Sequence, residues 1–268
     1  MSHWYSKTGD ACHTYTDASG AEKPTGLREA RKWGLLPSAS GVVHVWANKG
    51  LERARERKLI ATARITPYSE WGGTESFIAE VMKAALADWE LASSTGTVFH
   101  GLIESKLTKG EHSKTPIEWG GKMLDPEPLV EAALKVVSDI HILDVEKRVV
   151  RLKDGYAGTT DLPYKRDNGQ ILGVADWKTT KTTEKKKMAP KQGHVAQIAA
   201  YWMAYHGLHL DEIPSHAEGR NIYISTTEPG RIETLVYDHK ELRKGWAAFK
   251  ACLELWRQAN NYDPREPK

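Results

Sequence analysis

The stretch from Gly155 to Lys178, GYAGTTDLPYKRDNGQILGVADWK, predicts two β-strands around a tight turn. Between arms rich in Thr, Tyr, Ile and Val stands Asn168-Gly169, the strongest short hairpin signal, because a two-residue turn of this kind needs positive φ at both positions. If these two residues form the turn, Asp161 on one arm pairs with Asp176 on the other. Lys178, two residues further on, lies on the same side of the sheet.

This register places two like charges opposite each other and a proline in the ladder. Pro163 falls at a hydrogen-bonded position without an N–H to donate, which favours a bulge there. Opposed carboxylates destabilise a sheet unless a bound divalent cation or protonation of one of them offsets the repulsion. Lys178 brings only one charge. A surface salt bridge from Lys178 to one aspartate, with water around the other, is the simpler explanation of the hairpin taken alone.

Composition limits the classes of protein to consider. The 268 residues are 40% hydrophobic and 27% charged, which is typical of a globular chain able to bury a core. The formal net charge of +3 does not by itself indicate nucleic-acid binding. Two cysteines, Cys12 and Cys252, exclude a four-cysteine zinc or iron–sulfur site within this chain. No apolar run approaches membrane-spanning length and no signal peptide is evident, so we expect a cytoplasmic protein without membrane contact.

Periodicity and turn signals predict an α/β chain around a central sheet. Helices are expected over residues 25–33, from 50 onward, and over 74–89, 97–107, 129–138, 190–206 and 240–258. Strands are expected over residues 143–151, 156–164, 170–178, 221–226 and 231–237. Several tryptophans, Trp89, Trp246 and Trp256 among them, sit at helical spacing, so core packing explains them more simply than base stacking.

Polar residues that need an explanation lie on several of these elements. His100 and Glu104 share one face of a helix, Glu146 sits inside the strand LDVEKRVV, and Gln197 and Tyr201 share one face of the helix that follows the hairpin. Taken singly, His100 is explained as a satisfied core histidine, and Gln197 and Tyr201 as ordinary polar residues of a helix. Their joint order with Asp161, Asp176 and Lys178 is far more specific.

Four motifs in this order resemble the RecB-like nucleases of the PD-(D/E)XK superfamily, over roughly residues 75–205. They are Gly96-Thr97-Val98-Phe99-His100, Gly158-Thr159-Thr160-Asp161, Asp176-Trp177-Lys178, and Gln197 with Tyr201. The segment LREARKWGLLPSASGVVHVWANKGL is more loosely similar to phage and prophage nucleases of this group. The resemblance implies a restriction-endonuclease-like core, with a central mixed sheet flanked by helices. We expect a single nuclease domain over residues 1–268, with 1–73 as an N-terminal helical and loop extension and 74–268 as the core.

The chain departs from two branches of nucleases. It lacks the four cysteines that hold an iron–sulfur cluster in one branch, and it has no P-loop of a helicase, so neither a cluster nor a nucleotide is expected. Phosphodiester hydrolysis needs a hydroxide nucleophile and neutralised charge, and oxygen ligands suit Mg²⁺ or Mn²⁺ for both tasks.

The resemblance assigns a role to each candidate residue. Asp161, Asp176 and His100 would hold the metal together with the backbone carbonyl of Trp177. Lys178 would orient or deprotonate the attacking water, or stabilise the transition-state charge. Further supporting or DNA-binding residues are Gln197, Tyr201, Glu146 and Glu104.

A basic run, KTTKTTEKKKMAPK, follows the hairpin directly. A solvated, mobile loop is the commonest fate of such a run. Its position beside the candidate site equally suits a loop that contacts DNA phosphates through Lys181, Lys185, Lys186 and Lys187.

The expected function is a metal-dependent DNA exonuclease that acts on a free end without sequence preference, in phage-type recombination or repair. Its expected partners are DNA and a phage annealing or single-strand-binding protein. Two alternatives stay open. One is a structure-dependent or flap endonuclease on the same site, and the other is a DNA-binding module whose nuclease centre is idle.

Overall fold

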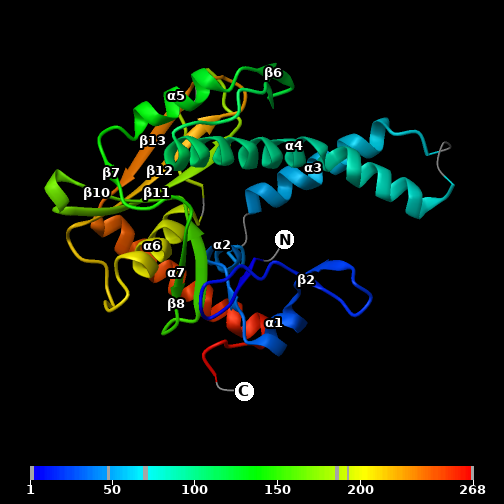
Figure 1. Cartoon of the computed structure of the whole chain (residues 1–268). Coiled ribbons are helices and arrows are strands. Elements are labelled where there is room, and N and C mark those ends of the chain that lie inside the picture. Colours follow the sequence, from blue (N-terminus) through cyan, green and yellow to red (C-terminus); the bar gives the residue numbers. More distant parts are fainter. Residues whose placement is uncertain (1–2, 47–48, 69–71, 185–186, 192, 267–268) are drawn as a thin grey trace.

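The computed structural model describes residues 3–46, 49–68, 72–184, 187–191 and 193–266. Its centre is a five-stranded mixed sheet in the order β13-β12-β11-β10-β7 (Figure 1). Only the β11–β12 pair is parallel within this sheet, and the other neighbours are antiparallel. The strands are β7 (His141–Ile142), β10 (Leu162–Arg166), β11 (Ile171–Thr180), β12 (Ala217–Ser225) and β13 (Ile232–Tyr237). The expected α/β architecture with a central mixed sheet is confirmed.

Helices cover both faces of this sheet (Figure 1). One face packs against α6 (His194–Tyr205) and α7 (His239–Asn260), and the other against α5 (Glu127–Val136) and the second half of α4 (Thr74–Lys109). Alternation along β11 fits this arrangement, because Val174 belongs to the α6–α7 core while Ala175 and Trp177 belong to the α4–α5 core.

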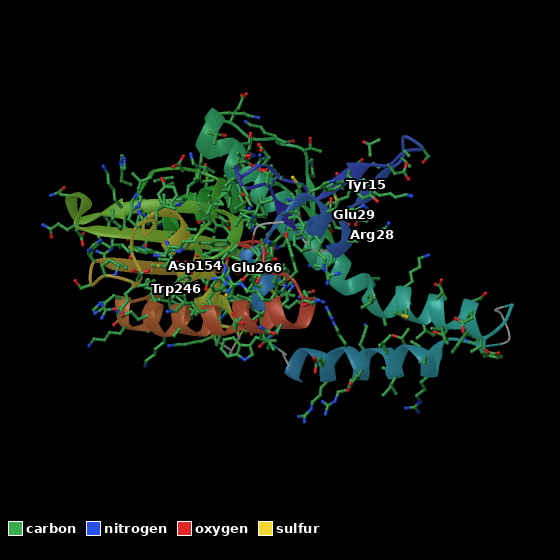
Figure 2. All side chains as sticks on the ribbon, turned by 90° about the horizontal axis from the view of Figure 1, so that it is seen from below. Tyr15, Arg28, Glu29, Asp154, Trp246 and Glu266 are labelled. Carbon is green, nitrogen blue, oxygen red and sulfur yellow. The ribbon has the colours of Figure 1, made fainter. Side chains whose placement is uncertain are left out.

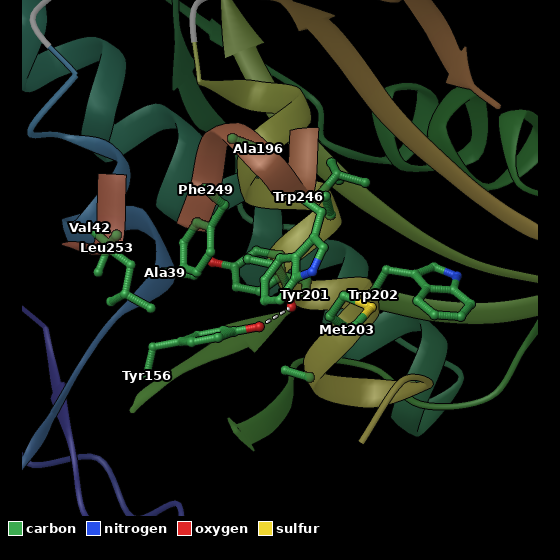
Figure 3. Packing of buried hydrophobic residues seen from close by; sticks show 14 of the residues in the cluster. Ala39, Val42, Tyr156, Ala196, Tyr201, Trp202, Met203, Trp246, Phe249 and Leu253 are labelled. Carbon is green, nitrogen blue, oxygen red and sulfur yellow. Dashed lines mark hydrogen bonds between the residues drawn. The ribbon is translucent and has the colours of Figure 1, made fainter. Parts of the chain in front are cut away.

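The larger core lies around α6 and α7. Tyr156, Trp246 and Phe249 pack edge to face or stacked, and the Tyr156 hydroxyl donates to the carbonyl of Ala200 at 2.9 Å (Figure 3). Trp246 and Trp256 are buried, as the sequence predicts, whereas the side chain of Trp89 lies outside the described residues. Residues before α3 (Lys49–Ile65) join the same core through Trp4, Leu35 and Val42, among others.

The remaining elements are short, apart from one helix. They are β1 (Trp4–Tyr5), β2 (Thr14–Thr16), β3 (Glu22–Pro24), α1 (Leu27–Trp33), β4 (Leu36–Pro37), α2 (Ala39–Val43), α3 (Lys49–Ile65), β5 (Ile117–Trp119) and β6 (Lys122–Leu124). None of the helices, within the described ranges, is long and apolar enough to cross a membrane.

Two of the expected strands are interrupted, at residues that lie side by side in the structure. Of residues 143–151, only β8 (Lys147–Arg151) is a strand, and residues 143–146 separate it from β7, while residues 156–164 divide into β9 (Tyr156–Thr160) and β10. Glu146 has a φ of 48° at the first break, and its N–H donates to the carbonyl of Asp161, which forms the second break, at 2.8 Å. The prediction of two continuous strands was therefore wrong. The chain leaves the main sheet here and forms a separate β8–β9 ribbon.

The hairpin register is confirmed, but its turn differs from the prediction. Leu162 pairs with Ala175 and Arg166 with Ile171, which is the expected register. The turn is a single 3-10 turn over Asp167–Gly169 in which all three residues have positive φ, rather than a two-residue turn. Pro163 pairs with Val174 without a bulge, because its carbonyl accepts from Leu143 on the β7 side and its missing N–H costs no bond to β11.

Helix boundaries also depart from the sequence expectation. Residues 74–89 and 97–107 belong to one continuous helix, α4, which ends at Gly110 with a φ of 77°. Helix α6 begins at His194 rather than near 190, because Gly193 adopts a left-handed conformation immediately before it. Helix α3 and the first half of α4 form a helical hairpin that projects from the body of the molecule (Figure 1).

Candidate metal centre

The candidate site lies where the β10–β11 ladder ends. The final pair of this ladder is Leu162 with Ala175, although β11 continues to Thr180. Beyond this pair the N–H of Trp177 donates to the carboxylate of Asp161 at 2.8 Å, in place of a backbone carbonyl. The carboxylate of Asp161 thus takes the hydrogen-bonding position of a neighbouring strand, at a part of β11 that β10 no longer pairs with.

Three ligand-type side chains meet at this edge. His100 Nδ1 lies 3.8 Å from Asp161 Oδ2 and 3.9 Å from Glu146 Oε1. The three ligand atoms lie within 4.8 Å of one another, with Asp161 buried and the other two half-buried. This group could hold a metal ion, and its chemistry of one imidazole and two carboxylates fits a divalent cation. His100 comes from α4, Glu146 from the β7–β8 break and Asp161 from the β9–β10 break, so three separate segments build the group.

Asp176 and Lys178 lie next to this group on β11. Asp176 is 2% exposed, and its Oδ2 lies 2.5 Å from Lys178 Nζ. The predicted placement of the two residues on one side of the strand agrees with this contact. Asp161 and Asp176 do not pair in the ladder, which ends at Leu162 and Ala175. The carboxylate of Asp161 instead accepts from the backbone N–H of Trp177.

The electrostatics of the centre are those of crowded acids. Burial raises the pKa of Asp161 well above its usual range, and the charges of Asp176 and Glu146 raise it further. Burial, then Glu104 and Asp176, raise the pKa of Glu146. Burial alone would lower the pKa of Lys178, but the nearby Asp176 and Asp161 raise it above its ordinary value. A cation bound among these carboxylates would relieve their mutual repulsion.

The surroundings of His100 favour its neutral form. Burial lowers its pKa, with Lys178 acting in the same direction, while Asp176 and a hydrogen bond to the backbone of Trp177 oppose the change. The backbone of Trp177, the expected carbonyl ligand, therefore lies within reach of His100. A neutral imidazole is the form that binds metals.

The glycines of two motifs allow close packing around the centre. A Cβ on Gly96 would lie 2.9 Å from Thr179 Oγ1, so this glycine lets α4 approach β11 four residues before His100. A Cβ on Gly158 would lie 2.7 Å from Cε1 of Tyr201. Tyr201 in turn accepts a hydrogen bond from Gln197 Nε2 at 3.0 Å. These contacts bring the Gly96 motif against β11 and the Gly158 motif against α6.

Sequence reasoning missed a polar chain behind Asp176. Asn221 Nδ2 donates to Asp176 Oδ2 at 3.3 Å, and its Oδ1 accepts from the Tyr237 hydroxyl at 3.0 Å. Tyr237 also bonds Tyr223, whose hydroxyl lies 2.6 Å from His194 Nδ1. An asparagine at the start of the largely apolar stretch NIYIS was the available signal, because a buried amide needs partners.

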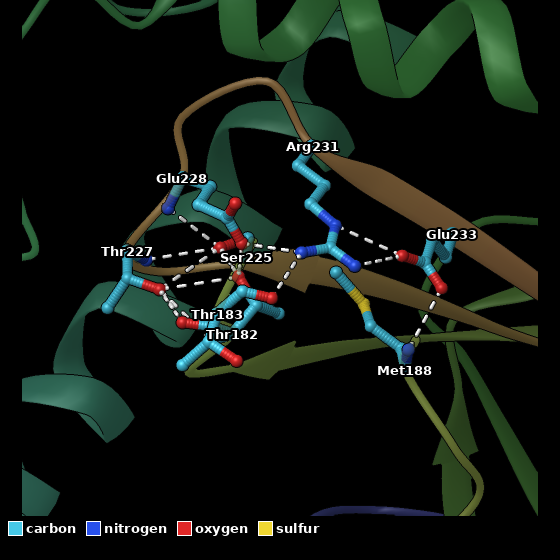
Figure 4. Close-up of polar contacts among 8 residues, drawn as sticks. All are labelled: Thr182, Thr183, Met188, Ser225, Thr227, Glu228, Arg231 and Glu233. Atoms are coloured by element: carbon cyan, nitrogen blue, oxygen red, sulfur yellow. Dashed lines mark hydrogen bonds and ion pairs between the residues drawn. The ribbon is translucent and has the colours of Figure 1, made fainter. Parts of the chain in front are cut away.

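The basic run after β11 contacts β12, β13 and the turn between them at two points, Thr182 and Met188 (Figure 4). Thr182 bonds Ser225 and Thr227, and the N–H of Met188 donates to Glu233 at 2.9 Å. Lys181 and Lys187 are exposed in this segment, while Lys185 and Lys186 lie outside the described residues. Glu104, on α4, is exposed, and its charge raises the pKa of Glu146.

Comparison with known proteins does not assign a family. No family model matches the chain, and no curated protein matches it. Among solved structures, the crystal structure of SSO0001 is similar with a TM-score of 0.26 and 15% identity, over 81% of this chain and 89% of that chain. A likeness at this level transfers neither fold nor activity, so function has to be argued from the chain's own site.

Proposed function

We propose that this chain is a metal-dependent DNA exonuclease of the RecB-like, PD-(D/E)XK type, with a restriction-endonuclease-like core. The observation that carries the proposal is the end of the β10–β11 ladder. There the carboxylate of Asp161 is held by the N–H of Trp177, beside the Asp176–Lys178 pair and within reach of His100 and Glu146. Acids, a neutral imidazole and a lysine converge on one strand edge, where an extended substrate can approach.

The residues present fit a hard divalent ion. Asp161, Asp176, Glu146 and His100 would hold Mg²⁺ or Mn²⁺, which supplies an activated water and neutralises charge on the phosphodiester. No thiolate lies in the group, which argues for these ions over softer ones.

Lys178 would act on the substrate side of the centre. Its ammonium has three N–H donors, and the contact with Asp176 leaves others for a phosphate oxygen or the attacking water. Asp176 fixes the position of this ammonium, and Asn221 in turn fixes Asp176 through a bond supported by Tyr237. Such a preorganised cation stabilises the charge that develops on the phosphate in the transition state.

The segment before α3 supports access by a strand end. Tyr5 contacts Thr159 through their hydroxyls at 3.1 Å, and Ser38 bridges to Ala157, so this segment lies against β9, the strand that leads to Asp161. A centre bordered in this way favours a free end over a continuous duplex. A biological setting in phage-type recombination or repair, beside an annealing or single-strand-binding protein, is part of the same proposal.

Linear and covalently closed circular DNA, each incubated with Mg²⁺ and followed on a gel, test the proposal. We expect degradation of the linear form, survival of the circle, and no reaction in EDTA. Nicking of the circle at a rate like that of linear digestion would overturn the exonuclease and support the endonuclease alternative. Binding of both forms without any cleavage would support a module with an idle centre.

A further inference from the structure

The helical hairpin of α3 and the first half of α4 presents a charged face that the centre does not use. Its two helices pack through a narrow strip in which Thr62 is 9% exposed on α3, and Val81 and Ala85 are buried on α4. Leu59 and Ala63, one turn apart on the same side of α3 as Thr62, are half-buried. Among the other described side chains of α3, Lys58 is half-buried and the rest are exposed.

Arginines gather on the side of α3 opposite this strip. Arg53, Arg57 and Arg64 are all exposed and, with Ile60, follow one another at intervals of four, three and four residues, which places them on one face. Ile60, at the middle of this stripe, is 70% exposed. Figure 2 shows nitrogen-tipped side chains on the outer side of this helix, pointing away from α4. Eleven residues of helix span about 16 Å.

Acidic residues do not cancel this stripe. Glu52 and Glu56 lie on a neighbouring flank of the helix, between the stripe and α4. The outer face is therefore positive, and arginine is the side chain best suited to bind phosphate oxygens in pairs.

The stripe is rigidly connected to the candidate centre. Helix α4 runs without a break from Thr74, in the hairpin, to His100 and beyond. At about 1.5 Å per residue, the helix covers about 39 Å between these two residues. A polyanion bound along α3 would thus be held at a fixed position relative to the metal ligands, several nucleotides away from the reacting bond.

We propose that the outer face of α3, defined by Arg53, Arg57 and Arg64, binds the phosphate backbone of the DNA substrate at a distance from the centre. This inference rests on the proposed function. The stripe holds the DNA between successive cleavages and takes no part in the chemistry. Phosphate contacts of this kind carry no base preference.

Salt dependence gives the proposal a quantitative form. Each phosphate neutralised on duplex DNA contributes about 0.9 to the slope of log K against log salt concentration. Three arginines should therefore account for a slope of about 2.7, and their replacement should lower affinity about 10-fold or more at moderate salt.

The test uses the full chain with Arg53, Arg57 and Arg64 all replaced by Gln, which has similar helix propensity. Binding to a fluorescent DNA of about 40 base pairs, long enough to reach the stripe at about 3.4 Å per pair, is measured in EDTA over a range of salt concentrations. Steady-state cleavage of the same DNA is measured in Mg²⁺. A triple variant of the exposed Lys122, Lys240 and Lys244 to Gln is the control, since it removes the same charge elsewhere.

We expect the arginine variant to lose affinity and salt slope and to show a raised KM with an unchanged kcat, while the control behaves like the wild type. Wild-type affinity and slope in the arginine variant would overturn the inference, as would an equal loss in both variants. Binding in EDTA requires no cleavage. A chain that binds through the stripe but never cuts would therefore contradict the proposed function and leave this inference standing.

Discussion

The ring of Tyr201 lies directly against the backbone of Gly158, so closely that a Cβ at this position would stand 2.7 Å from Cε1 of the ring. The contact joins two motifs that are 43 positions apart in sequence, one leading to Asp161 and the other on α6. Because Tyr201 is 5% exposed and bonded to Gln197, its ring has little room to move. Gly158 therefore sets how closely β9 and α6 approach beside the centre.

Replacement of Gly158 by Ala should disturb the centre through this contact. Overpacking of this kind costs about 1–3 kcal/mol, and we expect a lower melting temperature and a cleavage rate reduced about 10-fold or more. Calorimetry and single-turnover cleavage measure the two effects. The double variant Gly158→Ala with Tyr201→Leu should recover part of the stability. A single variant with wild-type melting and rate would show that the contact is unimportant.

Two glycines of α4 provide a matched pair. A methyl group added at Gly96 would lie 2.9 Å from Thr179 Oγ1, whereas a Cβ on Gly101 meets no atom within 4 Å. Gly101→Ala should stabilise the chain by about 0.5–1 kcal/mol through helix propensity, while Gly96→Ala should destabilise it and slow cleavage by displacing His100. Denaturant unfolding distinguishes the two. Equal effects of both substitutions would mean that α4 does not depend on Gly96 to approach β11.

The crowded carboxylates predict a stability that depends on metal. Saturating Mn²⁺ or Mg²⁺ should raise the melting temperature by about 5 °C or more, because the ion binds the folded centre. In metal-free buffer Asp161→Asn should melt no lower than the wild type, since an amide oxygen can still accept from Trp177 and one repelling charge is gone. The same variant should lose the metal-induced shift.

Asp211→Asn is the control for this prediction, because its side chain is 85% exposed and is not part of the group. It should keep the full shift. A wild-type melt indifferent to millimolar Mn²⁺ would count against a metal site at this edge.

Glu218 predicts how stability changes in acid. The ring of Tyr164 lies over Gly173 of β11, and its hydroxyl donates to Glu218 at 2.7 Å. Arg166 and Arg220 also donate to this carboxylate. Burial would raise the pKa of Glu218, but these donors lower it below its ordinary value. Its contribution is therefore full above the unfolded pKa of about 4.3 and is lost as the pH falls through the lower folded value.

Glu218→Gln should reduce stability at pH 7 by roughly 2 kcal/mol, because the buried Arg220 and the half-buried Arg166 each lose one charged partner and keep only Asp139 and Asp167. It should also flatten the fall in stability between about pH 5 and pH 3. Urea unfolding across this range measures both, with the exposed Glu131→Gln as control. An unchanged acid profile in Glu218→Gln would contradict the assignment.

The hairpin shows how much of this site the sequence could predict. The register from Leu162 to Arg166 follows from Asn168-Gly169 and from apolar alternation, both of which are local signals. The breaks at Glu146 and Asp161 do not, because they depend on each other through a bond between residues 15 positions apart. A single acidic residue within an apolar strand pattern lowers strand propensity but does not predict a break, so no decisive local signal marks either position.

Contacts between residues distant in sequence could not be predicted from local patterns either. Asn221 became part of the site because β12 pairs in parallel with β11 and brings residue 221 beside Asp176. The two expected helices join into α4 with Gly96 inside it, and the reason for a glycine there, the close approach of Thr179, lies 83 positions away in the sequence. The outward arginine face of α3 appears only once the inner face is known.

The rate of single-turnover cleavage of end-labelled linear DNA tests the central claim most directly. In Mg²⁺ the wild type should release label, and Asp161→Asn, Asp176→Asn and Lys178→Ala should each slow release by at least about 100-fold while binding DNA in EDTA as before. A wild type that cuts no DNA in Mg²⁺ or Mn²⁺, or any of these variants that cuts at close to the wild-type rate, would contradict the assignment of this strand edge as a nuclease centre.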